Sequence, residues 1–218
     1  MLHRHHNVWW QCGPDDHGEL SKKARKARAS LAPQGAGMYQ LAPMVSLTVQ
    51  LRLEPTEPFR NYAEATHYLE DLAARLQLRH LSYFVVTFRD GTPDDVVWVA
   101  TYDPAYMAQY MAHYTPLGDP AFDQAATAGA FADWSEMIGR DDPVTSDLER
   151  RAARFGITRY GLTMTMEDPG FGRVMFSVND RCGAADWPAR RKLLEAAFRP
   201  FMQDFHQRMK PLVTAHQS

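Results

Sequence analysis

The sequence predicts an α/β fold, a three-layer α/β/α sandwich around a mainly antiparallel sheet. Three observations support this prediction: an amphipathic helical pattern near residue 60, two pairs of β-rich segments further along, and a long helical pattern at the end. Segments joined by short turns pair in the antiparallel sense, and a helix at each end of the chain can cover the two faces of one sheet.

The first predicted helix follows Thr56, which is expected to cap it, and has Pro58 in its first turn. Its apolar side chains recur every three or four residues, as they do on the buried face of an amphipathic helix. They are Tyr62, Ala65, Leu69, Leu72 and Leu76.

Two segments rich in β-branched and aromatic residues come next, at residues 81–88 and 96–102. Turn-forming residues separate them, namely Asp90-Gly91 and Pro93. The two segments therefore predict a β-hairpin with a longer loop.

Helices are expected at residues 104–113, from near Asp119, and around residues 145–155. A second antiparallel strand pair is expected at residues 158–166 and 173–178, on the two sides of a turn that contains proline and glycine.

The last helix is expected from about Trp187 to Met209, with Pro200 bending it. Its apolar side chains fall on one stripe, which predicts a buried face. The stripe consists of Leu194, Phe198, Phe201 and Phe205.

Residues 1–43 show neither helical nor alternating periodicity and contain the glycine and proline pairs typical of loops. We expect them to form a disordered tail. Because Met38 and Met44 lie just before the first patterned segment, the tail is also consistent with a start codon assigned too early. Residues 44–213 are expected to form one domain, and residues 214–218 a short C-terminal tail.

Composition excludes several classes of protein. The chain has 218 residues, of which 45% are hydrophobic and 23% charged, and a formal net charge of −2. Its apolar runs are far shorter than the ~20 residues that cross a bilayer, and no secretory signal is recognisable, so a cytoplasmic protein is expected. Beyond residue 43 the chain is net acidic, which does not favour binding to nucleic acid.

No metal or cofactor site is expected. Cys12 and Cys182 are too few for a four-thiolate zinc site, and His3, His5 and His6 have no thiolate or carboxylate at ligand spacing. The sequence contains no nucleophile elbow, zinc-protease motif, phosphate-binding loop or dinucleotide fingerprint. An enzyme is therefore disfavoured.

The residues with the most chemical information are aromatic and acidic. Tyr102, Tyr106 and Tyr110 are four residues apart, which places them along one face of a helix. Asp119, before a proline, and Trp134 follow, so three phenols, a carboxylate and an indole converge if the chain folds back. Taken alone, a tyrosine stripe is also typical of a core, and aspartate before proline is typical of a helix cap.

The spacing of these five residues resembles the autoinducer-binding domain of LuxR-type quorum-sensing regulators. That family has Tyr, Trp, Tyr, Asp-Pro and Trp at these intervals. The glycine-containing segment at residues 155–164 and the final helix with its internal proline are also similar, so that the resemblance covers about residues 59–211. It implies that residues 44–213 are a sensor domain and not an enzyme.

The resemblance also implies a ligand, an N-acyl-homoserine lactone or a related acyl signal, and a role for each residue. Asp119 is expected to accept a hydrogen bond from the ligand amide, and Tyr102 to donate one to the amide carbonyl. Tyr110 and Trp134 are expected to wall the head group. The acyl tail is expected in a slot shaped by three methionines. These are Met164, Met166 and Met175.

Two positions depart from the family pattern. Tyr106 stands where the family has a tryptophan whose indole N–H donates to the lactone carbonyl, and a phenol projects its hydroxyl along a different vector. Met175 stands where members often have a serine or threonine that assists the amide carbonyl. The alternatives are therefore a lactone bound with altered selectivity, an unrelated signal, or no ligand. Since a buried aspartate without a partner is costly, a ligand is expected to stabilise the fold.

The expected function is therefore that of a signal-binding domain. Family regulators continue into a helix-turn-helix domain, and this sequence ends at Ser218, where that domain would begin. The domain is expected to form a homodimer, or a heterodimer with a full-length LuxR-type regulator, or to compete with one, without contacting nucleic acid or a membrane itself. A sensor for a non-lactone ligand, a truncated transcriptional regulator and, less favoured, a lactone or amide hydrolase are the alternatives.

Overall fold

The computed structural model describes residues 57–217, apart from residue 91 and residues 114–117, 129–130 and 138–141. The expected tail at residues 1–43 lies outside the described residues. In the described part of the chain, five strands form one sheet in the order β2-β1-β5-β4-β3, and every neighbouring pair is antiparallel. The strands are β1 (His80–Arg89), β2 (Thr92–Ala100), β3 (Phe131–Asp133), β4 (Gly161–Asp168) and β5 (Gly172–Asn179).

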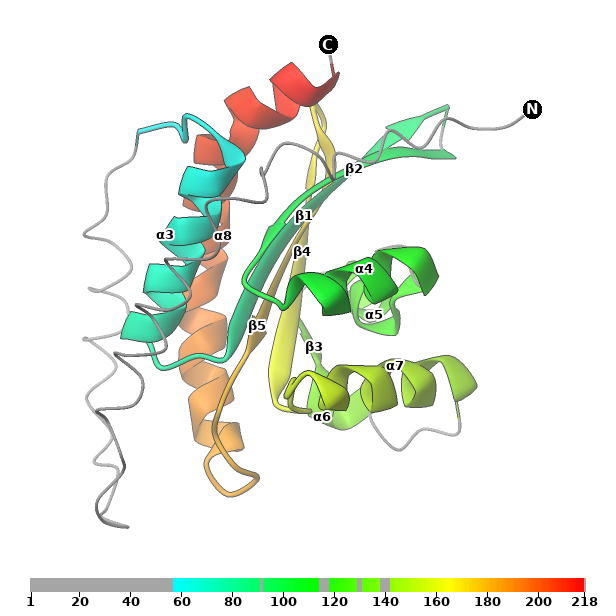
Figure 1. Cartoon of the computed structure of the whole chain (residues 1–218), viewed down its shortest axis with the longest axis vertical. Helices are drawn as coiled ribbons and strands as arrows, with labels where there is room; N and C mark the ends of the chain where they lie inside the picture. Colours follow the sequence, from blue (N-terminus) through cyan, green and yellow to red (C-terminus); the bar gives the residue numbers. More distant parts are fainter. Residues whose placement is uncertain (1–56, 91, 114–117, 129–130, 138–141, 218) are drawn as a thin grey trace. The chain divides into compact units, whose positions relative to one another are not determined.

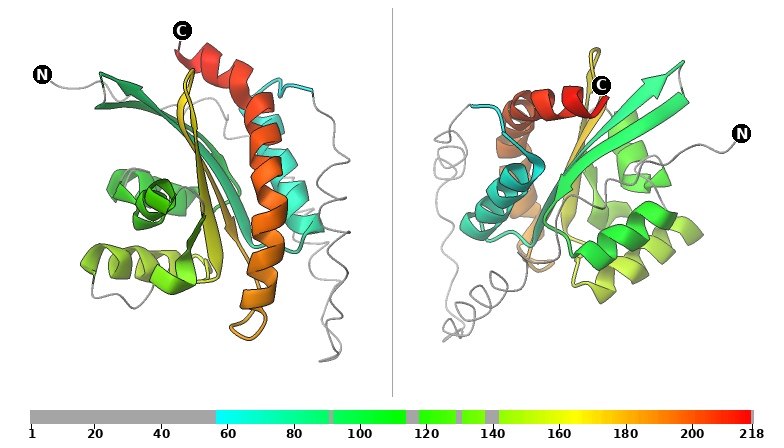
Figure 2. Two further views of the ribbon diagram at one scale, coloured as in Figure 1. Left: turned by 180° about the vertical axis from the view of Figure 1, so that it is seen from behind. Right: turned by 45° about the horizontal axis from the view of Figure 1, so that its top comes forward.

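Helices cover both faces of this sheet (Figure 1), which confirms the predicted α/β fold. One face carries α3 (Tyr62–Arg75) and α8 (Trp187–Gln217), as both views in Figure 2 show. The other face carries shorter helices. They are α4 (Pro104–His113), α5 (Pro120–Ala128), α6 (Trp134–Met137) and α7 (Pro143–Arg154).

The first and last helices therefore share a face, and the expectation that they cover opposite faces is wrong. The reason is the pairing of β1 with β5 at the centre of the sheet. Antiparallel partners point to the same side, and Tyr83 is opposite Phe176, so both strands present large apolar residues to one face. Both α3 and α8 bury their stripes against that face.

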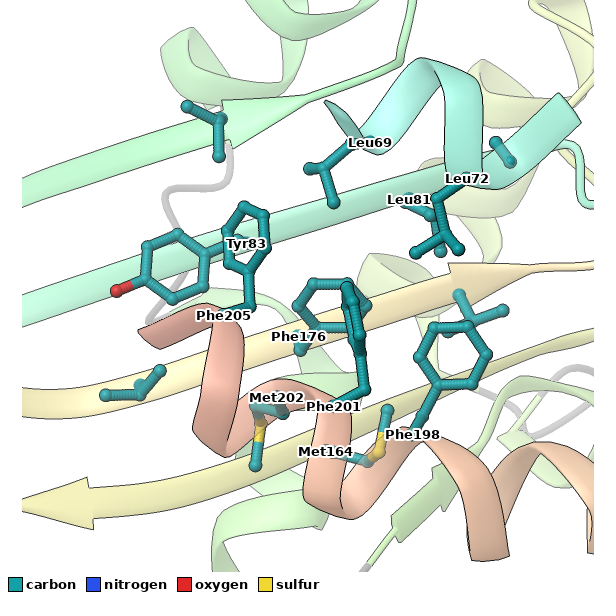
Figure 3. Packing of buried hydrophobic residues seen from close by; sticks show 14 of the residues in the cluster. Leu69, Leu72, Leu81, Tyr83, Met164, Phe176, Phe198, Phe201, Met202 and Phe205 are labelled. Atoms are coloured by element: carbon teal, nitrogen blue, oxygen red, sulfur yellow. The ribbon is translucent and has the colours of Figure 1, made fainter. Parts of the chain in front are cut away.

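The core under α8 is built largely from aromatic rings (Figure 3). The ring centroid of Phe176 lies 5.8 Å from that of Phe198, 5.3 Å from that of Phe201 and 5.9 Å from that of Phe205. Tyr83 contacts Phe205 edge-on at 5.2 Å. Edge-to-face and offset pairs at these separations are favourable beyond the area that they bury.

Helix α3 begins later than the sequence pattern suggested. Asn61 caps it, because its side chain accepts a hydrogen bond from Glu64 N at 2.8 Å, and Glu64 in turn accepts one from Arg60 N at 2.8 Å. Pro58 precedes the helix, and Thr56 lies outside the described residues. Asparagine followed three residues later by glutamate is a recognised helix-start signal, and it outweighs the Thr-x-Pro sequence.

The two hairpins differ in how well their turns were predicted. Arg89 pairs with Thr92, so the turn between β1 and β2 is short and the expected longer loop is wrong. Asp90 has a φ of 52°, in the left-handed region that aspartate tolerates better than most residues. The β4–β5 hairpin forms as expected and pairs continuously from Gly161 to Asp168, although β4 begins three residues later than the expected residue 158.

Helix α8 is longer than expected and continues through Pro200 and Pro211 to Gln217, so residues 214–217 are helical. Two short elements, β3 and α6, were not expected. None of the described helices is long and apolar enough to cross a membrane.

Candidate ligand-binding site

A cavity of about 220 Å³ lies on the face of the sheet that carries the short helices. Ser82, Phe84 and Ser177 of the central strands line its base, and residues of α4, α6 and α7 and of the start of α5 line its walls. The segment between α7 and β4 completes the wall with Ile157 and Thr158.

Five of the six residues predicted for the site line this cavity. They are Tyr102, Tyr106, Tyr110, Asp119 and Trp134. Tyr106 and Tyr110 lie on α4, and Tyr102 lies just before it, so the three rings form a ladder. Centroids are 5.3 Å apart for Tyr102 and Tyr106 and 6.0 Å apart for Tyr106 and Tyr110.

The methionines do not form the predicted slot. Met175 is not among the residues that line the cavity, although its buried side chain belongs to the same apolar cluster as Phe84 and Tyr106. Met164 and Met166 face α3 and α8 instead, because Met164 is paired with Phe176 and shares its side of the sheet. Because side chains alternate along a strand, Met164 and Met166 lie on one face of the sheet and Met175 lies on the other.

Asp119 both caps a helix and faces the cavity. Its Oδ1 accepts a hydrogen bond from Ala121 N at 2.8 Å, at the start of α5, and its Oδ2 accepts one from the Tyr110 hydroxyl at 2.9 Å. The expectation of a buried aspartate without a partner is therefore wrong. Asp119 can cap α5 and still accept a further hydrogen bond from the cavity, because each oxygen uses only one of its acceptor positions in these bonds.

Burial raises the pKa of Asp119 from 3.8 to about 6, against the opposing effect of the hydrogen bonds from Ala121 and Tyr110. Above that pH the cavity wall carries a poorly solvated negative charge, which favours a ligand with an N–H or O–H donor. Burial likewise raises the pKa of Tyr102 and of Tyr110, so both remain neutral phenols that can donate.

A row of hydroxyl groups crosses the sheet at the base of the cavity. Ser82 on β1 is opposite Ser177 on β5, and Ser177 is opposite Thr163 on β4. The Thr163 and Ser177 hydroxyls are 3.0 Å apart, and Trp134 Nε1 donates to Thr163 Oγ1 at 2.9 Å. Tyr102 and Ser82 both line the cavity. The row was missed because it depends on strand register, although the polar residues within apolar strands were visible in the sequence.

The Trp134 indole packs closely against the backbone of β4 at Gly161. A Cβ atom at Gly161 would lie 2.4 to 2.8 Å from three ring carbons of Trp134, closer than van der Waals contact allows. Glycine is therefore required here by the close approach of the indole, and not by its backbone angles.

Two charged residues also border the cavity, Glu149 on α7 and Arg159 before β4. Arg159 is exposed, and its Nη2 donates to Ser135 O at 3.4 Å. Neither was singled out from the sequence. Among the described residues no group of His, Cys, Asp or Glu is arranged to hold a metal ion.

Residues 61–209 match the family described as the autoinducer binding domain. The chain belongs to this family. The autoinducer-binding domain is the signal-sensing part of LuxR-type quorum-sensing regulators and is not an enzyme. No curated protein sequence matches the chain significantly.

Solved structures of LuxR-type proteins share the fold. Escherichia coli SdiA superposes with a TM-score of 0.57 at 17% identity, over 78% of this chain and 67% of SdiA. SdiA in complex with octanoyl-rac-glycerol superposes with a TM-score of 0.56 at 16% identity, over 82% of this chain and 69% of SdiA. CepR2 from Burkholderia cenocepacia superposes with a TM-score of 0.55 at 18% identity, over 77% of this chain and 93% of CepR2. It is described as an N-acylhomoserine lactone dependent LuxR family transcription factor.

Proposed function

We propose that this autoinducer-binding domain binds an N-acyl-homoserine lactone, or a closely related acyl signal, in the cavity between the sheet and the short helices. The observation that carries the proposal is Asp119, a buried carboxylate held by Tyr110 in the wall of an otherwise largely apolar cavity. A ligand that donates one hydrogen bond to Asp119 replaces the solvation that burial removed, which no purely apolar molecule can do.

The remaining groups suit the rest of such a molecule. The hydroxyls of Tyr102, Ser82 and Ser177 line the cavity and can donate to carbonyl oxygens of the ligand. Apolar lining residues, including Phe84, can contact an acyl chain. Because about 220 Å³ is below the ~300–1,000 Å³ of typical ligand pockets, we propose a short or medium chain.

A non-lactone acyl ligand is the second candidate, and Tyr106 favours it. Without the family tryptophan, the donor expected for the lactone carbonyl is changed. SdiA is known with octanoyl-rac-glycerol, an acyl ester whose glycerol hydroxyls can donate to a carboxylate as an amide can. The same carboxylate and hydroxyls can therefore pair with the polar groups of either ligand class.

Mass spectrometry of small molecules released from the purified protein tests the proposal. The protein is produced in a host that makes acyl-homoserine lactones and supplies acyl glycerols. We expect a stoichiometric acyl ligand from the native chain and little from Asp119→Asn. Asp123→Asn, which changes an exposed carboxylate on α5, is the matched control and should retain the ligand. Recovery of the same ligand from the Asp119 variant would refute the assignment.

How the domain acts once it has bound a signal stays a prediction. Pairing with a LuxR-type regulator and withdrawal of the signal from it, in the cytoplasm, are the two mechanisms that we propose. A gel-shift titration separates them. Pairing lowers operator binding by the regulator even at saturating signal, whereas withdrawal is reversed by added signal. No effect in either condition would contradict both.

A further inference from the structure

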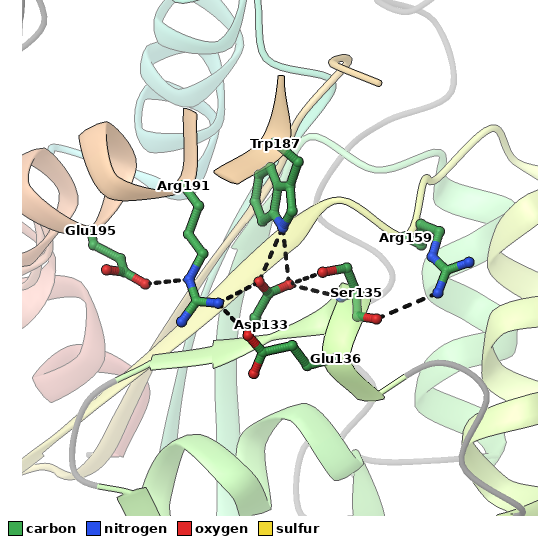
Figure 4. Close-up of polar contacts among 7 residues, drawn as sticks. All are labelled: Asp133, Ser135, Glu136, Arg159, Trp187, Arg191 and Glu195. Atoms are coloured by element: carbon green, nitrogen blue, oxygen red, sulfur yellow. Dashed lines mark hydrogen bonds and ion pairs between the residues drawn. The ribbon is translucent and has the colours of Figure 1, made fainter. Parts of the chain in front are cut away.

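A second buried carboxylate, Asp133, lies at the end of β3, directly before Trp134 of the cavity wall. Its exposed fraction is only 2%, and it does not line the cavity itself. Figure 4 shows that its carboxylate faces donors from two parts of the chain that are far apart in sequence.

The donors from the distant part come from the first turns of α8. Trp187 Nε1 lies 3.1 and 3.0 Å from the two oxygens of Asp133, and Arg191 Nη1 lies 2.7 Å from Oδ2. Ser135 supplies the local donors, its backbone N at 2.8 Å and its hydroxyl at 2.7 Å from Oδ1. A buried charge that is paired and fully hydrogen-bonded holds its partners in one geometry, and loss of one partner is costly.

This network matters for the cavity because the elements that carry Trp134 are short. Strand β3 has three residues and α6 has four, so few backbone hydrogen bonds fix them. The indole of Trp134 is fixed at its other end by Thr163 Oγ1. Its backbone position depends on Asp133, and through Asp133 on α8, which lies on the opposite face of the sheet.

We propose that Asp133 is a positioning residue for the ligand cavity, which couples the wall at Trp134 to the first turns of α8 through Trp187 and Arg191. The proposal rests on the proposed function in one respect, namely that a ligand occupies the cavity. It adds that occupancy on one face of the sheet is transmitted to a helix on the other face.

Hydrogen–deuterium exchange on the full chain tests the coupling in two arms. The first arm is ligand-free and follows the backbone amide of Ser135, which donates to Asp133. Trp187→Phe keeps a ring in place but removes the N–H donor, and should speed exchange at Ser135 about tenfold relative to amides of the central strands. Glu195→Gln is the matched control, because Glu195 binds Arg191 Nε without touching Asp133, and should leave Ser135 unchanged.

The second arm adds N-octanoyl-homoserine lactone. In the native chain it should slow exchange of residues 187–191 about tenfold, within the usual 5–150-fold range of coupling between sites, and in Trp187→Phe it should not. If Trp187 contributed only to global stability, Trp187→Phe would speed exchange at all core amides equally and would keep the response to the ligand. Arg191→Gln serves as the second variant if Trp187→Phe does not fold.

The outcomes separate the two proposals. Unchanged exchange at Ser135 in Trp187→Phe would overturn the positioning role, whether or not a ligand binds. Equal slowing of residues 187–191 in the native chain and in the variant would overturn the coupling, as would cavity protection without any effect on α8. If the lactone slows no amide of the native chain, the lactone proposal fails, and the ligand-free arm still decides the role of Asp133.

Discussion

The two faces of the sheet are built from alternate residues of the same strands, yet they differ in kind. Toward α3 and α8 the strands present Tyr83 and Phe176 to an aromatic core. Toward the short helices the neighbouring positions, Ser82 and Ser177, present hydroxyls to a cavity. Because side chains alternate along a strand, the same strands supply a packed core on one face and the polar base of a cavity on the other.

The difference predicts that the largest loss of stability comes from the packed face. Phe198 is fully buried among rings, so Phe198→Ala should reduce the free energy of unfolding by about 3–5 kcal/mol, measured by urea denaturation. Phe88, 39% exposed, provides the matched control, and Phe88→Ala should cost less than about 1 kcal/mol. Similar losses for the two variants would contradict the division between the faces.

A variant at the seat of Trp134 tests the other face. In Gly161→Ala the added Cβ atom would overlap ring carbons of Trp134 and must displace the indole, which should lower the free energy of unfolding by about 1–3 kcal/mol. Binding of N-octanoyl-homoserine lactone should weaken as well, measured by the ligand-induced shift in Tm. Gly183→Ala adds a Cβ atom with nothing within 4 Å and should change neither quantity. A full ligand response in Gly161→Ala would show that the indole position is unimportant.

The pH dependence of binding follows from Asp119, whose pKa is raised to about 6 by burial. A ligand that donates to the carboxylate binds the ionised form, so affinity should fall about tenfold per pH unit below 6 and level off above it. The stability of the unliganded fold depends on pH in the opposite direction. The contribution of Asp119 is favourable below its ordinary pKa and is lost as pH rises through about 6. Calorimetric titrations from pH 5 to 8 measure the first effect, and a flat profile would contradict it.

The smallest expected effect is an increase in affinity for the lactone. Tyr106→Trp restores the family residue, and one additional hydrogen bond to a lactone carbonyl is worth about 0.5–1.5 kcal/mol, or roughly two- to tenfold in affinity. Octanoyl glycerol has no lactone ring and should bind the variant no more tightly. Weaker lactone binding by Tyr106→Trp would count against the explanation given for this departure.

Much of the fold could be predicted because its long elements carry strong periodicity. The boundaries of α4 and the pairing of β4 with β5 agree closely with the sequence pattern. Elements as short as β3 and α6 leave no periodic signal, so they could not be predicted. The shared face of α3 and α8 depends on strand order, which local patterns do not contain.

The candidate site was predicted to a similar extent. The ring ladder and Asp119 were selected because their spacing resembles the LuxR-type pattern, and the cavity brings them together. The methionine slot failed because Met164 and Met175 were grouped by residue type without regard to strand alternation. The network of Asp133 joins residues more than fifty positions apart, so only the folded chain reveals it.

Calorimetric titration with N-octanoyl-homoserine lactone at pH 7.5 tests the central role of Asp119 most directly. Saturable binding of one ligand per chain is expected for the native protein and for Asp123→Asn. Asp119→Asn should bind at least tenfold more weakly while its far-ultraviolet circular dichroism stays native. Equal affinity of Asp119→Asn and the native chain would contradict the account.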